Sequence, residues 1–337
     1  MRIAFFDTHS YERAAFEKEN ASRGHEIVFL EPRLTPQTAS LARGCPAVCS
    51  FVDDEVGADA LRLLAAAEVR LLALRSAGYN HVDLLAAERA GIPVVRVPEY
   101  SPHAVAEHAV LLVLALDRKL CRAWSRVREW NFSLEGLVGF DLHRKRVGIL
   151  GTGKIGRVAA RIFVGFGCEV IAVDIAPDQL AAETIGFRYA KLDEMYETSD
   201  ILSLHVPLTP QTHHMIDARA LARMKRGALI VNTGRGALVD TPALVEALKN
   251  ERIGGAALDV YEEEEGLFFR DFSDQVIKDD VLARLLTFPN VLITSHQAFL
   301  THEALGGIAA TTLESITAFE RGEPLRMQVR AADVLRG

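Results

Sequence analysis

Residues 147–156 read VGILGTGKIG, and this stretch decides the fold class. The apolar run Val147–Leu150 is typical of a buried strand, and it leads into a Gly-x-Gly-x-x-Gly turn followed by a predicted helix over Ile155–Gly165. Such a glycine triple arises by chance in roughly one chain in ten of this length. The preceding strand and the following helix therefore carry the argument, and together they predict a dinucleotide-binding α/β fold.

The glycines of this turn have separate physical tasks. Gly151 permits the tight turn, Gly153 lets the backbone approach a pyrophosphate, and Gly156 lets the helix pack closely on the strand. The start of the helix adds free N–H groups and a partial positive charge, both of which attract phosphate. We expect a cofactor to contact Gly151, Gly153, Lys154, Ile155 and Gly156.

A second apolar run, Val170–Val173, ends in Asp174. A carboxylate at this place accepts a hydrogen bond from the adenosine ribose and repels a 2′-phosphate, so it favours NAD over NADP. The alternative interpretation is a structural glycine turn followed by a solvated acid.

Two further strand ends belong to the same predicted sheet. His205, Val206 and Pro207 follow the run that begins at Ile201, and residues 232–236 (NTGRG) follow the run that begins at Ala228. Ligands of doubly wound sheets lie at the carboxyl ends of the strands, so both segments are expected to face the cofactor.

Outward from this region, strand-like runs and helix-period segments alternate over most of the chain, which indicates parallel α/β sheets. Ser101 and Pro102 are the expected N-cap and first residue of a long helix that reaches about Lys119. Residues 122–141 show no clean periodicity, and a last helix is predicted over Glu303–Arg321. The pattern indicates two stacked α/β units, of which the second could be inserted in the first.

Composition limits the class of protein. A chain of 337 residues favours two domains, and a net charge of −7 argues against a nucleic-acid partner. The longest apolar stretch, Ala109–Leu116, is far shorter than a bilayer requires, and the N-terminus lacks the features of a signal peptide. The four cysteines match no zinc or redox spacing, so we expect buried thiols in a cytoplasmic protein without membrane contact.

Several segments, in the same order along the chain, resemble those of the D-2-hydroxyacid dehydrogenases, and in particular of their D-lactate dehydrogenase branch. Besides the glycine turn, the resemblance rests on RSAGYN at 75–80, AEHA at 106–109, NFSLEG at 131–136, NTGRGAL at 232–238, LDVYE at 258–262 and SHQAFLT at 295–301. The resemblance covers nearly the whole chain. It departs at Gly234, where many members of the family carry serine.

The resemblance implies a fold and an activity. The fold would consist of two Rossmann-like, doubly wound parallel-sheet domains, with an NAD domain (101–299) inserted in a substrate domain (1–100 and 300–337). The active site would lie in the cleft between them, and a homodimer would form through the NAD domains. The activity would be the NAD-dependent interconversion of a small 2-keto acid and its D-2-hydroxy acid, with pyruvate and D-lactate as the leading pair.

The resemblance also assigns residues. It implies Arg235, Glu264 and His296 as the catalytic residues, a carboxylate-binding turn at Ser76, Ala77 and Gly78, and pocket aromatics at Tyr100 and Phe299. We further predict cofactor contacts at Thr212, Thr233, Gly234 and Asp259.

These residue types suit the reduction of a keto acid. Arginine binds a carboxylate with two parallel hydrogen bonds and keeps its charge at any working pH. Histidine transfers protons near neutral pH, and a neighbouring glutamate stabilises its charged form. Residues 262–265 are four consecutive glutamates, so an assignment displaced by one residue from Glu264 stays open as an alternative.

Other chemistries receive less support. His213 with His214, and His103 with His108, lack the spacing that places two ligands on one helix face, so no metal site is predicted. Two alternatives to a D-lactate dehydrogenase remain. One is a dehydrogenase for a bulkier acid, such as phenylpyruvate or a branched 2-keto acid, and the other is an NAD-sensing co-repressor that uses the fold as a binding module.

Overall fold

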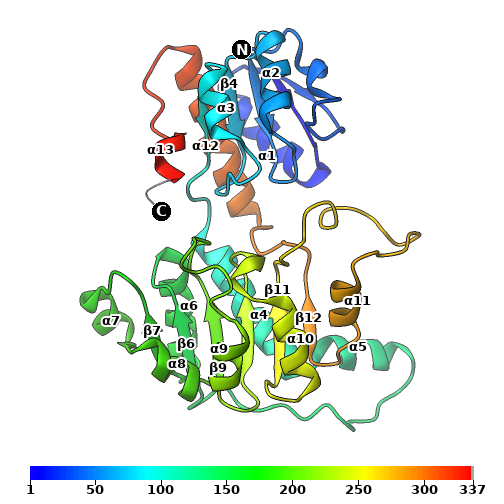
Figure 1. Ribbon diagram of the computed structural model, residues 1–337, viewed down its shortest axis with the longest axis vertical. Coiled ribbons are helices and arrows are strands. Elements are labelled where there is room, and N and C mark those ends of the chain that lie inside the picture. Colours follow the sequence, from blue (N-terminus) through cyan, green and yellow to red (C-terminus); the bar gives the residue numbers. More distant parts are fainter. Residues whose placement is uncertain (335–337) are drawn as a thin grey trace. The chain divides into compact units, whose positions relative to one another are not determined.

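A computed structural model describes residues 1–334 of the chain, and these residues form two compact units (Figure 1). Unit 1 comprises Met1–Ser101 and the segment that begins at Leu300, whereas unit 2 comprises Pro102–Phe299. The last three residues of the predicted substrate domain, 335–337, lie outside the described residues. The division falls one residue after the boundary expected at residue 100.

Unit 1 is built on a six-stranded sheet in the order β13-β5-β4-β3-β1-β2. Its strands pair in parallel, except that β13 runs antiparallel to β5. The strands and helices of unit 1 are β1 (Arg2–Phe5), α1 (Ser10–Asn20), β2 (Glu26–Phe29), η1 (Ala39–Ala42), β3 (Ala47–Ser50), α2 (Ala58–Ala66), β4 (Leu71–Leu74), α3 (Leu84–Arg89), β5 (Val94–Val95), α12 (His302–Glu320), β13 (Gln328–Val329) and α13 (Ala331–Val334).

Unit 2 is built on a seven-stranded parallel sheet in the order β12-β11-β10-β9-β6-β7-β8. The strand order reverses beside β6: β7 and β8 follow on one side of it, and the chain then crosses to β9 on the other side. Its elements are α4 (Pro102–Asp117), α5 (Leu120–Arg128), β6 (Arg146–Leu150), α6 (Lys154–Gly165), β7 (Glu169–Val173), α7 (Gln179–Ile185), β8 (Arg188–Tyr189), α8 (Leu192–Thr198), β9 (Ile201–Leu204), α9 (Ala218–Arg223), β10 (Leu229–Asn232), η2 (Gly236–Leu238), α10 (Thr241–Lys249), β11 (Gly255–Leu258), α11 (Asp280–Leu286) and β12 (Val291–Ile293).

Helices cover both faces of the unit 2 sheet, as a doubly wound fold requires. On one face Val147 and Ile149 pack with residues of α4 and α6. On the other face Leu150 packs with residues of α8, α9 and α10. This alternation buries every central strand and confirms the predicted class of two doubly wound α/β domains.

The structure corrects the sequence analysis at three elements. Residues 120–128 form a helix, α5, in the stretch where no clean periodicity was expected. Its apolar residues Leu120, Trp124 and Val127 do recur at helical spacing, but each is more than half exposed, so they do not face the core of the unit. The two-residue strands β8 and β13 were also missed, because two residues are too few to show a period.

Among the described helices, none combines the length and the apolarity that spanning a lipid bilayer requires.

Candidate functional site

The glycine turn has the geometry that its sequence predicts. Gly151 has a φ of +94°, and a Cβ there would lie 2.6 Å from the carbonyl oxygen of His205. A Cβ on Gly156 would lie 1.9 Å from the carbonyl oxygen of Gly151. Gly153, the N-cap of α6, would meet nothing within 4 Å, so the space beside it is open. The start of α6, at Lys154 and Ile155, therefore presents its amides beside a backbone that a phosphate can approach.

Asp174 lies directly after β7 and is bound to the glycine turn. Its carboxylate accepts hydrogen bonds from the amide and the hydroxyl of Thr152 (2.6 and 2.9 Å) and from the amide of Ala176 (2.8 Å). Burial opposes ionisation, but these hydrogen bonds and the charge of Arg157 hold the pKa of Asp174 below its usual range. The side chain is thus an ionised acceptor beside the turn, which is the state that ribose recognition requires.

The segment after β9 forms the neighbouring part of the same sheet edge. Ser203 and the ring of His205 share a hydrogen bond (2.9 Å), and burial lowers the pKa of His205 to about 4. The following turn is closed by Thr212, whose hydroxyl donates to the carbonyl of Pro207 (2.7 Å). A neutral histidine and a fixed turn therefore border the region after Val206.

Thr233 supplies an independent sign that the edge binds a polar ligand. Its hydroxyl is buried and has no hydrogen-bond partner among the described residues. Buried hydroxyls usually find a partner, so this one is suited to a ligand group. Together with the open space at Gly153 and the ionised Asp174, Thr233 shows that the residues of this edge fit an NAD molecule.

Arg235 lies on the loop after β10, half-buried, and a buried amide fixes that loop. Asn232 donates to the carbonyl of Arg235 (2.8 Å) and accepts from the amide of Gly234 (3.0 Å). One guanidinium nitrogen of Arg235 donates to the carbonyl of Gly234 (2.7 Å), which leaves other donors of the planar group for a ligand. Serine would fit at position 234, since a Cβ there makes only ordinary contacts of 3.5 Å or more.

Gly236 joins the arginine loop to the glutamate segment. A Cβ on Gly236 would lie 2.1 Å from the carbonyl carbon and oxygen of Tyr261 and 2.4 Å from the amide of Glu262. Only glycine allows the two backbones to lie so close. The contact places the segment that carries Arg235 directly against the start of the glutamate run.

Within that run, the structure pairs Glu264 with His296. One carboxylate oxygen of Glu264 lies 2.9 Å from Nδ1 of His296, and the other accepts from the amide of Tyr261 (3.0 Å). Glu263 and Glu265 are exposed. The ring of Phe269 lies 5.8 Å from the histidine ring, between centroids. His296 is thereby oriented through Nδ1, which leaves Nε2 for another partner.

Asp259, which was predicted as a cofactor contact, lies in the interior of unit 2. It is fully buried, and its carboxylate accepts from the amides of Gln297 and Ala298 (2.9 and 2.8 Å), from the hydroxyl of Thr294 (2.5 Å) and from His108. Burial raises its pKa, but these donors outweigh it and hold the pKa below the usual range. Asp259 therefore fixes the loop that presents His296, whose backbone has a φ of +48°.

The predicted carboxylate-binding turn lies in unit 1, after β4. Its three carbonyl groups are engaged: Ser76 accepts from the amide of Val97 (3.0 Å), Ala77 from Arg96 (2.8 Å) and Gly78 from the hydroxyl of Ser76 (2.7 Å). The amides of Ala77 and Gly78 make no hydrogen bond to any described residue. Two free amides beside each other are suited to an anionic group.

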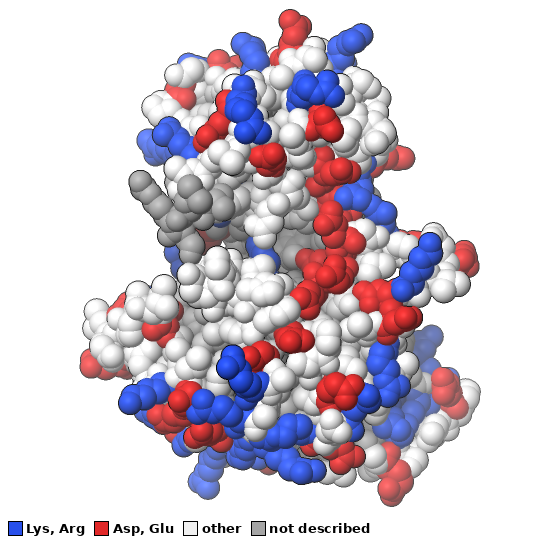
Figure 2. Space-filling model, in the orientation of Figure 1, with Lys and Arg blue, Asp and Glu red and all other residues white. Residues whose placement is uncertain are grey.

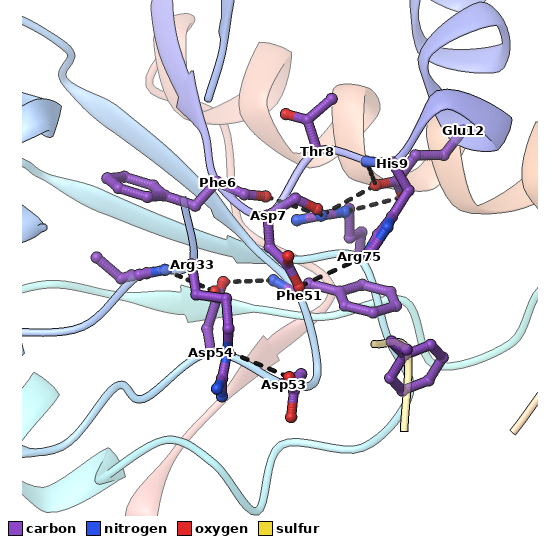
Figure 3. Close-up of polar contacts among 12 residues, drawn as sticks. Phe6, Asp7, Thr8, His9, Glu12, Arg33, Phe51, Asp53, Asp54 and Arg75 are labelled. Carbon is purple, nitrogen blue, oxygen red and sulfur yellow. Dashed lines mark hydrogen bonds and ion pairs between the residues drawn. The ribbon is translucent and has the colours of Figure 1, made fainter. Parts of the chain in front are cut away.

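Arg75, which precedes this turn, is a positioning residue that the sequence analysis quoted without assigning a role. Its guanidinium is buried, forms an ion pair with Glu12 (2.9 Å) and donates to the carbonyls of Phe6 and Asp7 (2.8 and 2.6 Å; Figure 3). These bonds tie the end of β4 to the end of β1, which holds the start of the turn in place. Tyr100 lies at the end of the first segment of unit 1, and Phe299 closes unit 2.

Basic and acidic side chains are interspersed over unit 2 on the face drawn in Figure 2. Several pair directly, such as Arg223 with Asp193 and Glu197 (2.6 and 2.8 Å). Arginines that are paired with carboxylates in this way have little charge left to attract the phosphates of a nucleic acid.

Comparison with known proteins gives consistent results. Residues 110–298 match the family model described as D-isomer specific 2-hydroxyacid dehydrogenase, NAD binding domain. The chain is 53% identical to a 2-hydroxyacid dehydrogenase homolog of Zymomonas mobilis and 48% identical to the D-lactate dehydrogenase of Escherichia coli, in each case over 96% of this chain and 98% of the relative. The apo-structure of D-lactate dehydrogenase from Escherichia coli superposes with a TM-score of 0.91 at 45% identity, covering 98% of this chain and all of that one.

Proposed function

Because the chain belongs to the D-isomer-specific 2-hydroxyacid dehydrogenases, a family of NAD-dependent oxidoreductases, we propose that it reduces pyruvate to D-lactate with NADH. The reaction takes one hydride and one proton to the keto group of pyruvate and yields D-lactate and NAD⁺. The relative of that name from Escherichia coli supports this choice of substrate pair.

The proposed roles follow from the contacts of unit 2. When bound, NADH supplies the hydride. Arg235 binds the substrate carboxylate through its planar guanidinium. His296 gives the proton to the carbonyl oxygen through Nε2, while Glu264 holds the ring at Nδ1 and stabilises its charged form.

The observation that carries the proposal is the carboxylate–imidazole pair between Glu264 and His296. Its two partners come from segments 32 residues apart in the chain, and the neighbouring Gly236 contact places the arginine loop on the same stretch of backbone. An NAD-binding regulator needs the cofactor edge of the sheet, whereas a histidine oriented by a carboxylate is a requirement of proton transfer.

The proposal is tested by steady-state kinetics with NADH and a panel of 2-keto acids, on the wild type and on His296→Gln. Pyruvate is expected to give the highest kcat/KM, and the variant should lose about 10²- to 10⁴-fold in kcat because glutamine cannot transfer a proton. NADH affinity, measured by fluorescence titration, should change little.

Each alternative corresponds to a distinct result. A preference for phenylpyruvate or a branched keto acid would identify a dehydrogenase for a bulkier substrate. NADH binding without turnover of any keto acid would favour a co-repressor and contradict the proposal. Wild-type kinetics in His296→Gln would remove the histidine from the reaction.

We further propose that the enzyme is a cytoplasmic homodimer joined through unit 2. Free cysteines support a reducing compartment, since Cys45, Cys49 and Cys168 are buried thiols and Cys121 is an exposed one. The exposed apolar residues of α5 and of the segment that follows it support the dimer, because a surface of this kind is normally covered by a partner.

A further inference from the structure

Two adjacent histidines meet one of the four glutamates in unit 2. His213 and His214 lie in the turn after Thr212, and Glu262 lies four residues beyond β11. One nitrogen of each ring and one carboxylate oxygen all lie within 4.8 Å of one another. His213 is exposed, whereas the other two are half-buried. The cluster is therefore open to solvent on one side and held by the fold on the other.

The two imidazole rings are arranged side by side. Their centroids lie 3.9 Å apart and their planes are inclined by 26°. An ion that binds an imidazole nitrogen lies near the plane of the ring, so the two stacked rings bind one ion only after one of them rotates, and the exposed side chain of His213 is free of the packing that would prevent this. The backbone of His214, with a φ of +51°, donates from its amide to the carbonyl of Ala237 (2.8 Å), so the turn is fixed to the loop behind it.

The carboxylate of Glu262 is already oriented toward these rings. One of its oxygens lies 2.5 Å from Nε2 of His214, and the other accepts from the hydroxyl of Thr241 (3.0 Å). A ligand carboxylate that is itself hydrogen-bonded from behind is a recurring feature of metal sites. Glu262 has no part in the pairing of Glu264 with His296, so it is available for a separate function.

We propose that His213, His214 and Glu262 bind a divalent transition-metal ion of the zinc class. Two imidazole nitrogens and one carboxylate oxygen form a common zinc ligand set, with bonds of about 2.0 to 2.2 Å and water in the fourth position. Ligand atoms in such a site lie roughly 3.3 Å apart. Small side-chain rotations of the three residues would separate Nε2 of His214 from Glu262 and free it for the ion. The ring binds in its neutral form with the proton on Nδ1, so a neutral ring changes tautomer through solvent, and a doubly protonated ring releases one proton.

The sequence analysis predicted no metal here because adjacent histidines cannot share a helix face. That argument does not apply to this segment, since residues 211–214 form a turn. The third ligand lies 48 residues from His214 in the chain, and only the fold brings it near.

The test is calorimetric titration of chelator-treated, tag-free protein with Zn²⁺ alone. All proteins should carry Cys121→Ser, because the exposed thiol of Cys121 could bind zinc by itself. The principal variant is His213→Gln, since an exposed side chain can be replaced with little effect on folding. The matched control is His143→Gln, which changes another exposed histidine of unit 2.

The parent is expected to bind one Zn²⁺ per chain and to melt at a higher temperature when zinc is present. His213→Gln should bind at least about tenfold more weakly and lose the thermal shift, and Glu262→Gln should behave likewise. His143→Gln should match the parent. Mg²⁺ should give no heat, because it prefers oxygen ligands.

The proposal is overturned if the parent binds no zinc or if His213→Gln binds it as tightly as the parent. It is also overturned if His296→Gln abolishes binding while His213→Gln does not, since the ion would then belong to the pair with Glu264.

Discussion

At the scale of single residues, two carboxylates with separate functions position the proposed proton donor. Asp259 accepts hydrogen bonds from the backbone amides of Gln297 and Ala298 and so fixes the loop, whereas Glu264 contacts the ring of His296. The left-handed backbone at His296 costs energy for a residue with a side chain. The hydrogen bond from its amide to the carbonyl of Asp259 (2.7 Å) helps to stabilise that conformation.

Glu264→Gln removes the charge beside the ring while nearly preserving its shape. The ring then loses the carboxylate that orients it through Nδ1, so kcat for pyruvate reduction should fall by on the order of 10- to 10²-fold with little change in NADH affinity. The measurement is steady-state kinetics with NADH and pyruvate. Glu263→Gln and Glu265→Gln are matched controls, since both side chains are exposed, and a loss of kcat in either of them instead would assign the role to that residue.

His205 makes folding stability depend on pH. Its pKa is about 4 in the folded protein, because burial disfavours its charged form, against 6.5 for an ordinary histidine. Between these values the unfolded chain binds a proton that the folded protein does not, so stability is lost as the pH falls from about 6.5 to 4. His205→Gln should remove up to about 3 kcal/mol of this loss.

Urea denaturation of the cofactor-free protein across that pH range measures the effect. The stability curve of His205→Gln should be flatter than that of the wild type, and that of His103→Gln, which changes an exposed histidine, should follow the wild type. Parallel curves for His205→Gln and the wild type would show that His205 binds its proton equally well in the folded and the unfolded protein.

At the scale of elements, the site depends on loops whose backbones touch. The loop after β10 carries Arg235, and the loop after β11 carries the glutamates. Their closest approach is at Gly236, against the peptide between Tyr261 and Glu262. Any side chain at position 236 must push the two loops apart.

Gly236→Ala is therefore expected to lower both stability and activity. Forced overpacking costs about 1–3 kcal/mol, and displaced catalytic groups should lower kcat/KM for pyruvate by on the order of 10²-fold. Thermal melting and steady-state kinetics measure the two effects. Gly234→Ala is the control, since its Cβ meets atoms at 3.5 Å or more, and equal behaviour of the two variants would contradict the loop contact.

The sequence predicted the elements well where burial imposes a period. The strand predicted at Val147–Leu150 begins one residue earlier in the structure, at Arg146, and the helix predicted to end near Lys119 ends at Asp117. Helix α5 was missed because its apolar residues are exposed and lie among charged ones. Strand β13 was missed because it is defined only by its partner β5.

The same limit applies to the candidate site. Local motifs identified His296 and the glutamate run, and their pairing is a contact between distant segments. The structural role of Asp259 and the cluster at Glu262 could not be predicted, because their partners, such as His108 and His214, lie on other elements. Sequence pattern indicates which residues carry chemistry, and tertiary contacts decide which of them act together.

At the scale of the whole molecule, α5 and the segment that follows it present a large apolar surface. Leu120, Trp124, Trp130, Phe132 and Leu134 are each more than half exposed, and Trp130 reaches 84%. Aromatic residues of this size are enriched where protein surfaces associate. The surface supports the proposed dimer of unit 2.

Trp124→Asp places a charge in this surface and should shift the protein from dimer to monomer. Light scattering at micromolar concentration measures the change in mass. Leu180→Asp is the control, because Leu180 is 75% exposed on α7, away from α5 in the chain. An unchanged mass for Trp124→Asp would remove α5 from the dimer contact.

The insertion of unit 2 into unit 1 sets an order of events during translation. Unit 1 packs α1 against α12 and pairs β5 with β13, so its core requires residues that are synthesised after unit 2. Unit 2 is continuous from Pro102 to Phe299 and is complete as soon as it emerges. At typical elongation rates, the nascent first hundred residues wait on the order of ten seconds or more for their missing helix. During that interval the apolar side chains of β4, which pack against α12, are incompletely covered, and exposed apolar surface of this kind is prone to aggregation.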